Sequence, residues 1–214
     1  MADPFSRMRR PYEAGRLEQA DLAPTWHDQL RRWLEEAERS RVPEPTAMLL
    51  ASADAGGAPS VRTVLLKGLD ERGLRFYTNL RSRKGRELSE NPQACACFSW
   101  TAIERQVTVD GRVEALPDAD SDAYFGSRPR GSRLAALASP QSQVIRSRAA
   151  LDEAYAEASR THAEAVPRPA WWGGLCLVPS AVEFWQGRPD RLHDRLRYRR
   201  TPQQESWTIE RLAP

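Results

Sequence analysis

Short segments with strand character, joined by tight turns, dominate the chain between residues 47 and 116 and restrict the folds open to it. QACACFSW and ERQVTVDGRVEAL alternate in the strand manner, and the other segments are short, mainly apolar runs bounded by turns. The connections DAGG and DERG are glycine turns of the kind that join antiparallel neighbours. We therefore predict an antiparallel sheet containing AMLLASA (47–53), SVRTVLLKG (60–68), LRFYTN (74–79), QACACFSW (93–100) and ERQVTVDGRVEAL (104–116).

Helical periodicity comes before and after these strands. Residues 25–41 predict an amphipathic helix that covers the sheet, with Thr25 and Asp28 arranged like an N-terminal cap. Its apolar face contains Trp26, Leu30, Trp33, Leu34 and Ala37. Further helices are predicted over 82–92, 117–129, 130–139 and 147–165, and strands over 175–187, 195–200 and 206–214.

The order of these elements indicates the fold class. Strands come first, helices are inserted late, and strands return at the end, which is typical of an α+β domain built on an antiparallel barrel with helices packed around it. With 214 residues, of which 40% are hydrophobic, the chain is long enough for one well-packed domain. No apolar run approaches the roughly 20 residues that span a bilayer. The first residues lack the apolar segment of a secretory signal, so we expect a cytoplasmic protein without a membrane partner.

The charge is nearly balanced but locally clustered. The 32 Lys and Arg residues are almost balanced by 29 Asp and Glu residues spread along the chain, which disfavours a nucleic-acid partner. The cations gather in four short clusters, 81–86, 127–133, 146–148 and 185–200, so we expect them to converge on small anions. The three cysteines are interpreted as small buried hydrophobic residues, and the sequence predicts no metal site.

Several cations stand where an anion could be bound. Arg83 and Lys84 begin a predicted helix, where free backbone N–H groups and the helix dipole add to their charge. Arg62 and Lys67 share a predicted strand on opposite faces, unless a bulge or bend intervenes. No glycine-rich nucleotide loop is present, so a phosphate must be held mainly by side chains. For each of these cations taken singly, a solvated surface position is the alternative.

A second candidate site lies near the C-terminus. Arg191, His193 and Arg195 would point to one face if this segment were a strand, where a core face would require apolar residues. The alternative is a solvated basic edge strand. The segment SPQSQ supplies Gln141 and Ser142, neutral turn residues suited to completing hydrogen bonds to phosphate oxygens.

A set of motifs resembles the pyridoxamine/pyridoxine 5′-phosphate oxidase family, in order and with similar spacing from about residue 40 to the end. These motifs are RTVLLKG, FYTNLRSRKGREL, ERQVTVDGRVE, YFGSRPRGS, SPQSQVI, WWGG, EFWQGRPDRLHDR and ERLAP. The resemblance implies an FMN-binding split barrel of the α+β class. It also implies a homodimer with two flavins bound in clefts between the subunits.

The resemblance assigns residues to FMN and to the substrate. FMN contacts carried over by motif are Arg62, Thr63, Val64, Leu65, Leu66, Lys67, Tyr77, Thr78, Arg83, Lys84, Gln106, Gln141, Ser142, Trp185 and Arg195. Substrate contacts are Arg9, Tyr12, Lys67, Tyr124, Arg128, Ser132, Arg191, Leu192 and His193. Arg191 and His193 are the candidate catalytic residues. Residues 1–20 are expected to form a flexible arm that closes over the site, and residues 21–214 the oxidase domain.

The activity implied is oxidation of pyridoxine or pyridoxamine 5′-phosphate to pyridoxal 5′-phosphate, with molecular oxygen as electron acceptor and hydrogen peroxide as product. Two alternatives remain. One is a related split-barrel flavin oxidase or reductase with another substrate. The other is a non-catalytic basic module that binds nucleic acid or delivers pyridoxal phosphate; absence of flavin absorbance and strongly salt-dependent DNA binding would favour it.

Overall fold

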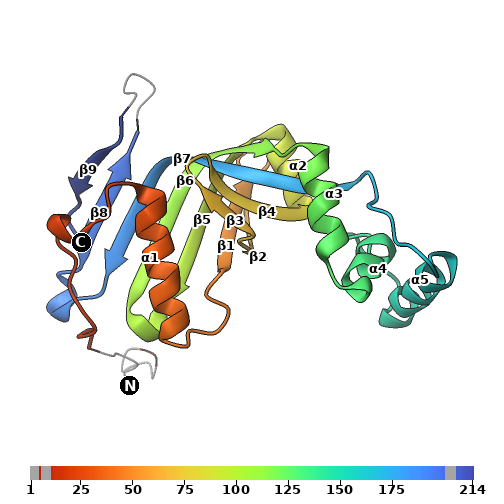
Figure 1. Ribbon diagram of the computed structural model, residues 1–214, viewed down its shortest axis with the longest axis horizontal. Coiled ribbons are helices and arrows are strands. Elements are labelled where there is room, and N and C mark those ends of the chain that lie inside the picture. The colour runs from red at the N-terminus through yellow and green to blue at the C-terminus, as the bar shows by residue number, and fades with distance from the viewer. Residues whose placement is uncertain (1–4, 6–10, 201–205) are drawn as a thin grey trace. The chain divides into compact units, whose positions relative to one another are not determined.

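The structure, a computed structural model, describes residue 5 and residues 11–200 and 206–214. It contains an antiparallel sheet and helices and confirms the α+β class (Figure 1). The helices are α1 (Trp26–Arg39), α2 (Arg83–Glu90), α3 (Asp118–Ser127), α4 (Arg130–Ala138) and α5 (Arg148–Thr161). Among the described residues, no helix combines the length and the apolar content that crossing a membrane requires.

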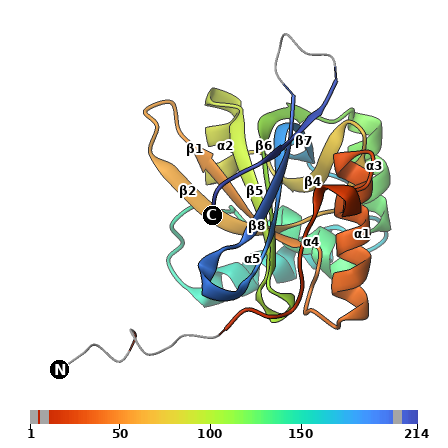
Figure 2. The same cartoon turned by 90° about the vertical axis from the view of Figure 1, so that its left-hand side faces the viewer.

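The strands follow the predicted order closely. They are β1 (Ala47–Ala53), β2 (Pro59–Leu65), β3 (Gly68–Asp70), β4 (Gly73–Asn79), β5 (Gln93–Trp100), β6 (Arg105–Ala115), β7 (Trp172–Gln186), β8 (Asp194–Arg199) and β9 (Thr208–Arg211). Hydrogen-bonded neighbours follow the order β2-β1-β5-β6-β7-β4-β3, with β8 pairing β7 and β9 pairing β8. The pairs β3–β4, β4–β7, β7–β8 and β8–β9 are antiparallel. Strands β8 and β9 lie side by side in Figure 1, and Figure 2 shows β8 from a second direction.

The chain divides into two compact units. Unit 1 contains the described residues up to Leu49, Cys95–Gly111 and the described residues from Pro179 on. Unit 2 contains Leu50–Ala94 and Arg112–Val178.

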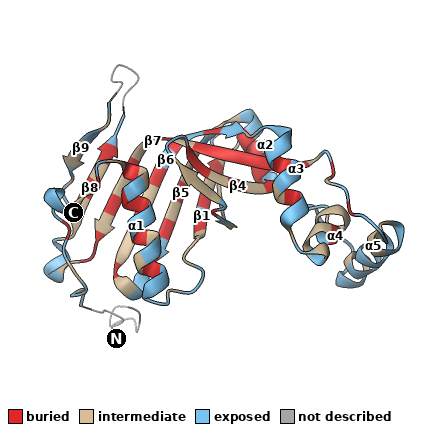
Figure 3. Ribbon diagram, in the orientation of Figure 1, coloured by how far each residue is buried: buried red, intermediate tan, exposed pale blue. Residues whose placement is uncertain are grey.

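Helix α1 supplies much of the core of unit 1. The hydroxyl of Thr25 accepts a hydrogen bond from the N–H of Asp28 at 3.2 Å, which confirms the predicted cap. Buried positions follow one side of α1, while the other side is exposed (Figure 3). Trp33 meets Phe184 of β7 edge-on, with ring centroids 5.1 Å apart. The helix therefore packs on the C-terminal part of β7, which agrees with the prediction that it covers the sheet.

Unit 2 has a partly aromatic core that includes side chains of its helices. Phe125 of α3, Leu134 of α4, Val166 and Trp172 of β7 form a buried cluster, and Tyr124 packs against it partly buried. Helices α4 and α5 are in contact with one another (Figure 1). None of the residues of α5 is fully buried, so this helix packs through a partly buried face.

Two differences from the predicted strands affect candidate site residues. Strand β2 ends at Leu65, and Lys67 lies beyond it, where its N–H donates to the carbonyl of Arg75 at 2.8 Å. The alternation argument for Arg62 and Lys67 therefore does not apply, because the two residues do not share one strand. A run of β-branched and apolar residues continues through this break, so the pattern alone could not reveal it.

The second difference lies before β8. This strand begins at Asp194, whereas Arg191 belongs to a short 3-10 helix over Pro189–Arg191. Asp190 and Arg191 both have left-handed backbone angles, with φ of 55° and 63°. The expected common strand face of Arg191, His193 and Arg195 is therefore wrong, because the chain turns before the strand starts.

The cysteine interpretation is confirmed in part. Cys176 is buried, while Cys95 and Cys97 of β5 are only half-buried, and all three thiols are free. Burial raises the pKa of each thiol, to about 12 for Cys95. A thiol with a raised pKa is a poor nucleophile and a poor metal ligand, which agrees with a packing role.

Candidate active site

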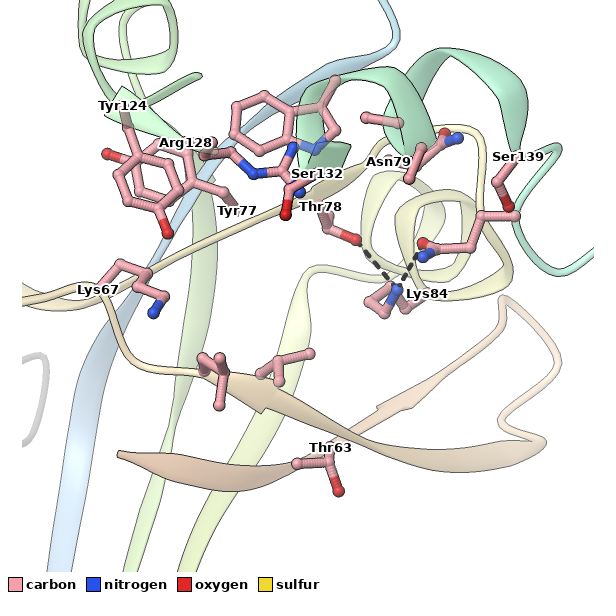
Figure 4. A pocket seen from close by; sticks show the side chains of 16 residues that line it. Thr63, Lys67, Tyr77, Thr78, Asn79, Lys84, Tyr124, Arg128, Ser132 and Ser139 are labelled. Atoms are coloured by element: carbon pink, nitrogen blue, oxygen red, sulfur yellow. Dashed lines mark hydrogen bonds between the residues drawn. The ribbon is translucent and has the colours of Figure 1, made fainter. Parts of the chain in front are cut away.

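A pocket of about 470 Å³ opens in unit 2, and cationic side chains lie at two places along it (Figure 4). It is formed by β2, the segment after it, β4, the first turn of α2, α3, α4 and the start of β7. Its lining residues are Thr63, Val64, Leu65, Lys67, Tyr77, Thr78, Asn79, Lys84, Tyr124, Arg128, Ser132, Ala135, Ala136, Ser139, Gln141 and Trp172.

Lys84 marks one end of the pocket. Its side chain comes from the first turn of α2, where the hydroxyl of Ser82 caps the helix by accepting from the N–H of Gly85 at 3.3 Å. The ammonium group donates to Thr78 Oγ1 and to Gln141 Oε1, both at 3.0 Å. These acceptors are neutral, so they hold the ammonium in place without cancelling its charge.

The charge of Lys84 is opposed by its surroundings. The residue is 8% exposed, and burial lowers the pKa of its ammonium to about 8, helped by the positive charge of Arg62 and countered by Glu87. A bound anion would reverse this shift, because an opposite charge nearby favours the protonated form. This end of the pocket is thus suited to a phosphate.

Arg128 marks the other end, beside Lys67, Tyr124 and Ser132 (Figure 4). Its guanidinium lies over the Trp172 ring, 4.9 Å from the centroid. One of its terminal nitrogens is buried without a hydrogen-bond partner among the described residues. A buried N–H group without an acceptor is costly, so an incoming anion would satisfy a donor that the protein leaves open.

Stacked aromatic rings line the pocket beside Arg128 (Figure 4). Tyr77 and Tyr124 stack at 4.0 Å with an angle of 17° between ring planes, and Trp172 continues the stack at 5.5 Å from Tyr77. Gly174 of β7 makes room for them, because a Cβ there would lie 2.7 Å from Tyr77 Cε1. The pocket thus combines a flat aromatic surface with two cationic regions, an arrangement that fits ring systems carrying phosphates.

The structure brings together most of the residues predicted for this region. Those that line the pocket are Thr63, Val64, Leu65, Lys67, Tyr77, Thr78, Lys84, Tyr124, Arg128, Ser132 and Gln141. Leu66 is buried, and Ser142 is an exposed turn residue with φ of 68°. Arg62 and Arg83 lie outside the lining and both bind the carboxylate of Glu87. Their assignment to FMN stays a prediction.

The remaining predicted residues that the structure describes belong to unit 1. There the rings of Trp185 and His193 lie 4.6 Å apart, and Tyr12 packs edge-on against both, at 5.7 Å from Trp185 and 5.6 Å from His193. Gly187 lies below Tyr12, since a Cβ there would be 2.9 Å from Tyr12 Cγ. The N–H of Ala14 donates to Glu104 at 2.8 Å. The segment that carries Tyr12 is thus fixed to its own unit.

The protonation state of His193 follows from its surroundings. Its Nδ1 accepts a hydrogen bond from the backbone N–H of Arg188 at 3.1 Å, so the ring proton belongs on Nε2. Burial, and then the positive charge of Arg191, lower the pKa of the imidazole. The neutral ring therefore presents an N–H donor at Nε2.

Other charged and polar residues of unit 1 have partners of their own. Arg195 binds Glu183 through two hydrogen bonds of 2.7 and 3.0 Å, which raise the pKa of Arg195. Gln106 donates to Thr108 at 3.3 Å, and the side chain of Leu192 is 70% exposed. Arg9, predicted to contact the substrate, lies outside the described residues.

Sequence reasoning missed part of the pocket lining, namely Asn79, Ala135, Ala136, Ser139 and Trp172. Trp172 belongs to WWGG, one of the motifs of the resemblance, so a signal for it was present. The alanines carry no chemical signal, because only packing places them at a pocket wall.

Comparisons with known proteins identify relatives over the whole chain. Residues 34–162 match the family described as pyridoxamine 5′-phosphate oxidase, and residues 172–214 match the pyridoxine 5′-phosphate oxidase C-terminal dimerisation region. The pyridoxine/pyridoxamine 5′-phosphate oxidase of Thermobifida fusca is 51% identical over 219 residues, covering 100% of this chain and 99% of the relative. That of Frankia alni is 54% identical over 210 residues, covering 96% and 87%.

Solved structures agree on the fold. PhzG from Burkholderia lata 383, in complex with tetrahydrophenazine-1-carboxylic acid, has a TM-score of 0.82 and 34% identity, covering 91% of this chain and 98% of its own. A pyridoxamine 5′-phosphate oxidase-related, FMN binding protein from Nostoc punctiforme has a TM-score of 0.69 at 21% identity, covering 91% and 100%. These neighbours confirm the predicted split barrel.

Proposed function

The chain belongs to the pyridoxamine 5′-phosphate oxidase family, and from this premise we propose that it is an FMN-dependent oxidase that converts pyridoxine or pyridoxamine 5′-phosphate to pyridoxal 5′-phosphate. The observation that carries the proposal is the pocket of unit 2, which has Lys84 at one end and Arg128 at the other. Two phosphates, one on the cofactor and one on the substrate, account for both.

The residues around Lys84 fit the phosphate of FMN. Its ammonium is held by Thr78 and Gln141, and the capped first turn of α2 adds backbone N–H groups. The aromatic wall and the apolar side chains of Val64 and Leu65 suit a flat ring system. When bound, FMN would accept two electrons and a proton from the substrate and pass the electrons to molecular oxygen.

The residues around Arg128 fit the phosphate of the substrate. Arg128 offers an unpaired buried N–H, Lys67 a second positive charge, and Tyr124 and Ser132 neutral hydroxyl groups. Fixing a substrate by its phosphate leaves its reacting carbon in a defined position, and such orientation can lower a barrier by several kcal/mol. The protein's main contribution is therefore placement.

Arg191, Leu192 and His193 are proposed to contact the pyridine ring of the substrate. Because Nδ1 of His193 accepts from the backbone of Arg188, the imidazole can donate from Nε2 without a change of charge. That donor suits a ring oxygen or nitrogen acceptor better than it suits removal of a proton. We therefore assign His193 a role in orienting the substrate. Tyr12 and Arg9 are proposed to contact the substrate from the N-terminal arm.

A homodimer is the proposed assembly, with the flavins bound in clefts between subunits. It is supported by the match of residues 172–214 to a C-terminal dimerisation region. The FMN contacts proposed in unit 1 are Gln106, Trp185 and Arg195.

One assay tests the proposed function. Purified protein is loaded with FMN and given each phosphorylated vitamer in air, while the aldehyde and hydrogen peroxide are measured together. The proposal predicts equal amounts of both products, and much slower turnover of the vitamers that lack phosphate. Absence of aldehyde from either phosphorylated vitamer in the flavin-loaded protein would exclude the proposal.

A second candidate has one observation in its favour. The PhzG structure binds a tricyclic carboxylic acid that has no phosphate in its name. A carboxylate could meet Arg128 in place of a phosphate. In the same assay, faster oxidation of a reduced tricyclic carboxylic acid than of either phosphorylated vitamer would favour this alternative.

A further inference from the structure

Glu87 is a buried carboxylate in α2 to which the proposed function gives no role. Only 4% of the residue is exposed. It lies one turn after Lys84, and its carboxylate binds residues of two neighbouring strands. Ser52 of β1 and Ser60 of β2 each donate a hydroxyl hydrogen bond to Glu87 Oε2 at 2.6 Å. Glu87 therefore joins α2 to both strands.

The same carboxylate binds the two arginines beside the pocket. Arg62 approaches Glu87 Oε2 at 3.2 Å, and Arg83 Nε donates to Oε1 at 2.7 Å. Arg62 also donates to the carbonyl of Leu50 at 3.1 Å, and to the hydroxyls of Ser52 and Ser60. Arg62 is thus held by β1, β2 and α2 together. The side chain of Arg83 is 56% exposed, and Glu87 holds it at Nε only.

The charge of Glu87 is maintained by these donors. Burial alone would raise the pKa of its carboxyl, but hydrogen bonds from Ser52, Ser60 and Arg83 and the charge of Arg62 outweigh burial and lower the pKa to about 2. The group is therefore ionised at neutral pH. Removing one partner of a buried ion pair is costly, because it leaves the remaining charge uncompensated.

We propose that Glu87 is a positioning residue for the anion-binding end of the pocket, which fixes the first turn of α2, Arg62 and Arg83 against β1 and β2. Lys84, in that turn, is thereby held toward Thr78 and Gln141. This inference rests on the proposed function, since it takes the phosphate of FMN as the anion. It makes Arg62 chiefly a support of the site, while the terminal nitrogens of Arg83 have no hydrogen-bond partner among the described residues and are proposed to reach the phosphate.

Other roles of Glu87 predict different effects of its substitution on flavin binding. If Glu87 acted only by direct repulsion of a nearby phosphate, its neutralisation would strengthen FMN binding. If it were only a part of the fold, its loss would weaken binding of every flavin equally. A positioning role predicts a loss confined to the phosphate-bearing flavin.

The test compares FMN with riboflavin, which lacks the phosphate. Dissociation constants of both are measured by fluorescence titration of the apoprotein for the wild type, Glu87→Gln and, as a matched control, Glu90→Gln at an exposed position of the same helix. We expect Glu87→Gln to weaken FMN binding about tenfold or more, since charged hydrogen bonds contribute about 1.5–3 kcal/mol. Riboflavin binding should change less than about twofold, and Glu90→Gln should change neither.

Each other outcome contradicts the inference. Unchanged or tighter FMN binding, or an equal loss for both flavins, would overturn it. If Glu87→Gln fails to fold, Ser60→Ala decides, because it removes one donor to Glu87 without a change of charge, and it should lower FMN affinity several-fold with riboflavin unaffected. Wild-type protein that binds FMN no better than riboflavin would instead overturn the proposed function, and this inference with it.

Discussion

Lys84 shows how one residue can prepare a site for an anion. Its ammonium is buried among neutral oxygens, which lowers its pKa to about 8, so the free protein pays to keep it charged. The phosphate of the proposed cofactor would remove this cost on binding. Protonation of Lys84 and binding of an anion beside it therefore favour one another.

This coupling predicts a pH dependence of FMN binding. The ammonium of Lys84 has a pKa of about 8 in the free protein and a higher pKa when a phosphate is bound beside it. FMN binding must therefore take up a proton above pH 8. The dissociation constant should rise above pH 8 by up to about tenfold per pH unit. Calorimetry in buffers of different ionisation enthalpy measures the proton uptake. Lys84→Arg, which stays charged, should remove this pH dependence. A dissociation constant of the wild type that does not change from pH 7 to 9.5 would contradict the prediction.

His193 carries a second prediction at the residue scale. His193→Ala and Arg191→Ala should lower kcat/KM by about 10-fold to 100-fold, since each removes an orienting contact worth about 1.4–2.7 kcal/mol. Both variants should keep their bound flavin and remain yellow. Wild-type kinetics in either variant would show that its residue does not contact the substrate ring. Protonation of His193 should also lower kcat/KM of the wild type at acid pH. Because the pKa of His193 is lowered, this fall should begin below the usual histidine value of about 6.5.

The limits of sequence reasoning at this scale are visible in Arg62. The assignment of Arg62 to FMN stays a prediction, and in the structure its guanidinium binds Glu87, which lies 25 positions away in the chain. The sequence gives the type of each charged group but not the partner that folding places beside it. Lys84 and Arg128, assigned by their motifs to FMN and to the substrate, both line the pocket, and these contacts stay predictions.

At the scale of elements, the segment around Tyr12 is held by a small number of contacts. Gly15 accepts a hydrogen bond from Arg188 at 3.0 Å, and the N–H of Leu17 donates to Asp194 at 3.0 Å. With the bond between Ala14 and Glu104, these contacts fix Tyr12 over Gly187. The position of Tyr12 thus depends on a glycine in the FWQG motif.

Gly187→Ala tests this dependence. The added Cβ would lie 2.9 Å from Tyr12 Cγ and 3.0 Å from Glu104 Cβ, so Tyr12 must move. We expect a several-fold rise in KM for the phosphorylated vitamer with an unchanged affinity for FMN, because the movement is confined to the segment around Tyr12. Gly126→Ala is the control, since nothing lies within 4 Å of its Cβ position. Equal KM values in both variants would argue against a substrate contact by Tyr12.

Elements were predicted more reliably than their ends. The helix over Trp26–Arg39 was recognised from its apolar periodicity and cap, both of which are local. The break after Leu65 and the turn at Asp190 and Arg191 were missed. The break after Leu65 is accompanied by a backbone bond from Lys67 to Arg75, which a strand-like run of residues does not predict. The turn uses left-handed backbone angles at Asp190 and Arg191, which residues other than glycine rarely adopt.

At the scale of the whole molecule, the proposed assembly is a dimer. Sedimentation of the flavin-loaded protein should give a mass twice the 24.2 kDa of one chain. If the flavin clefts lie between subunits, dilution that separates the chains should also release FMN. A monomer that keeps its flavin and full turnover would contradict the shared cleft.

The central claim is that the pocket binds a second phosphate, on the substrate, through Arg128. The direct measurement is the ratio of kcat/KM for pyridoxamine 5′-phosphate to that for pyridoxamine, in the wild type and in Arg128→Ala. We predict that the variant lowers this ratio by about 10-fold to 100-fold, because a charged hydrogen bond of about 1.5–3 kcal/mol is lost only for the phosphorylated substrate. A ratio that is the same in both proteins would contradict the account.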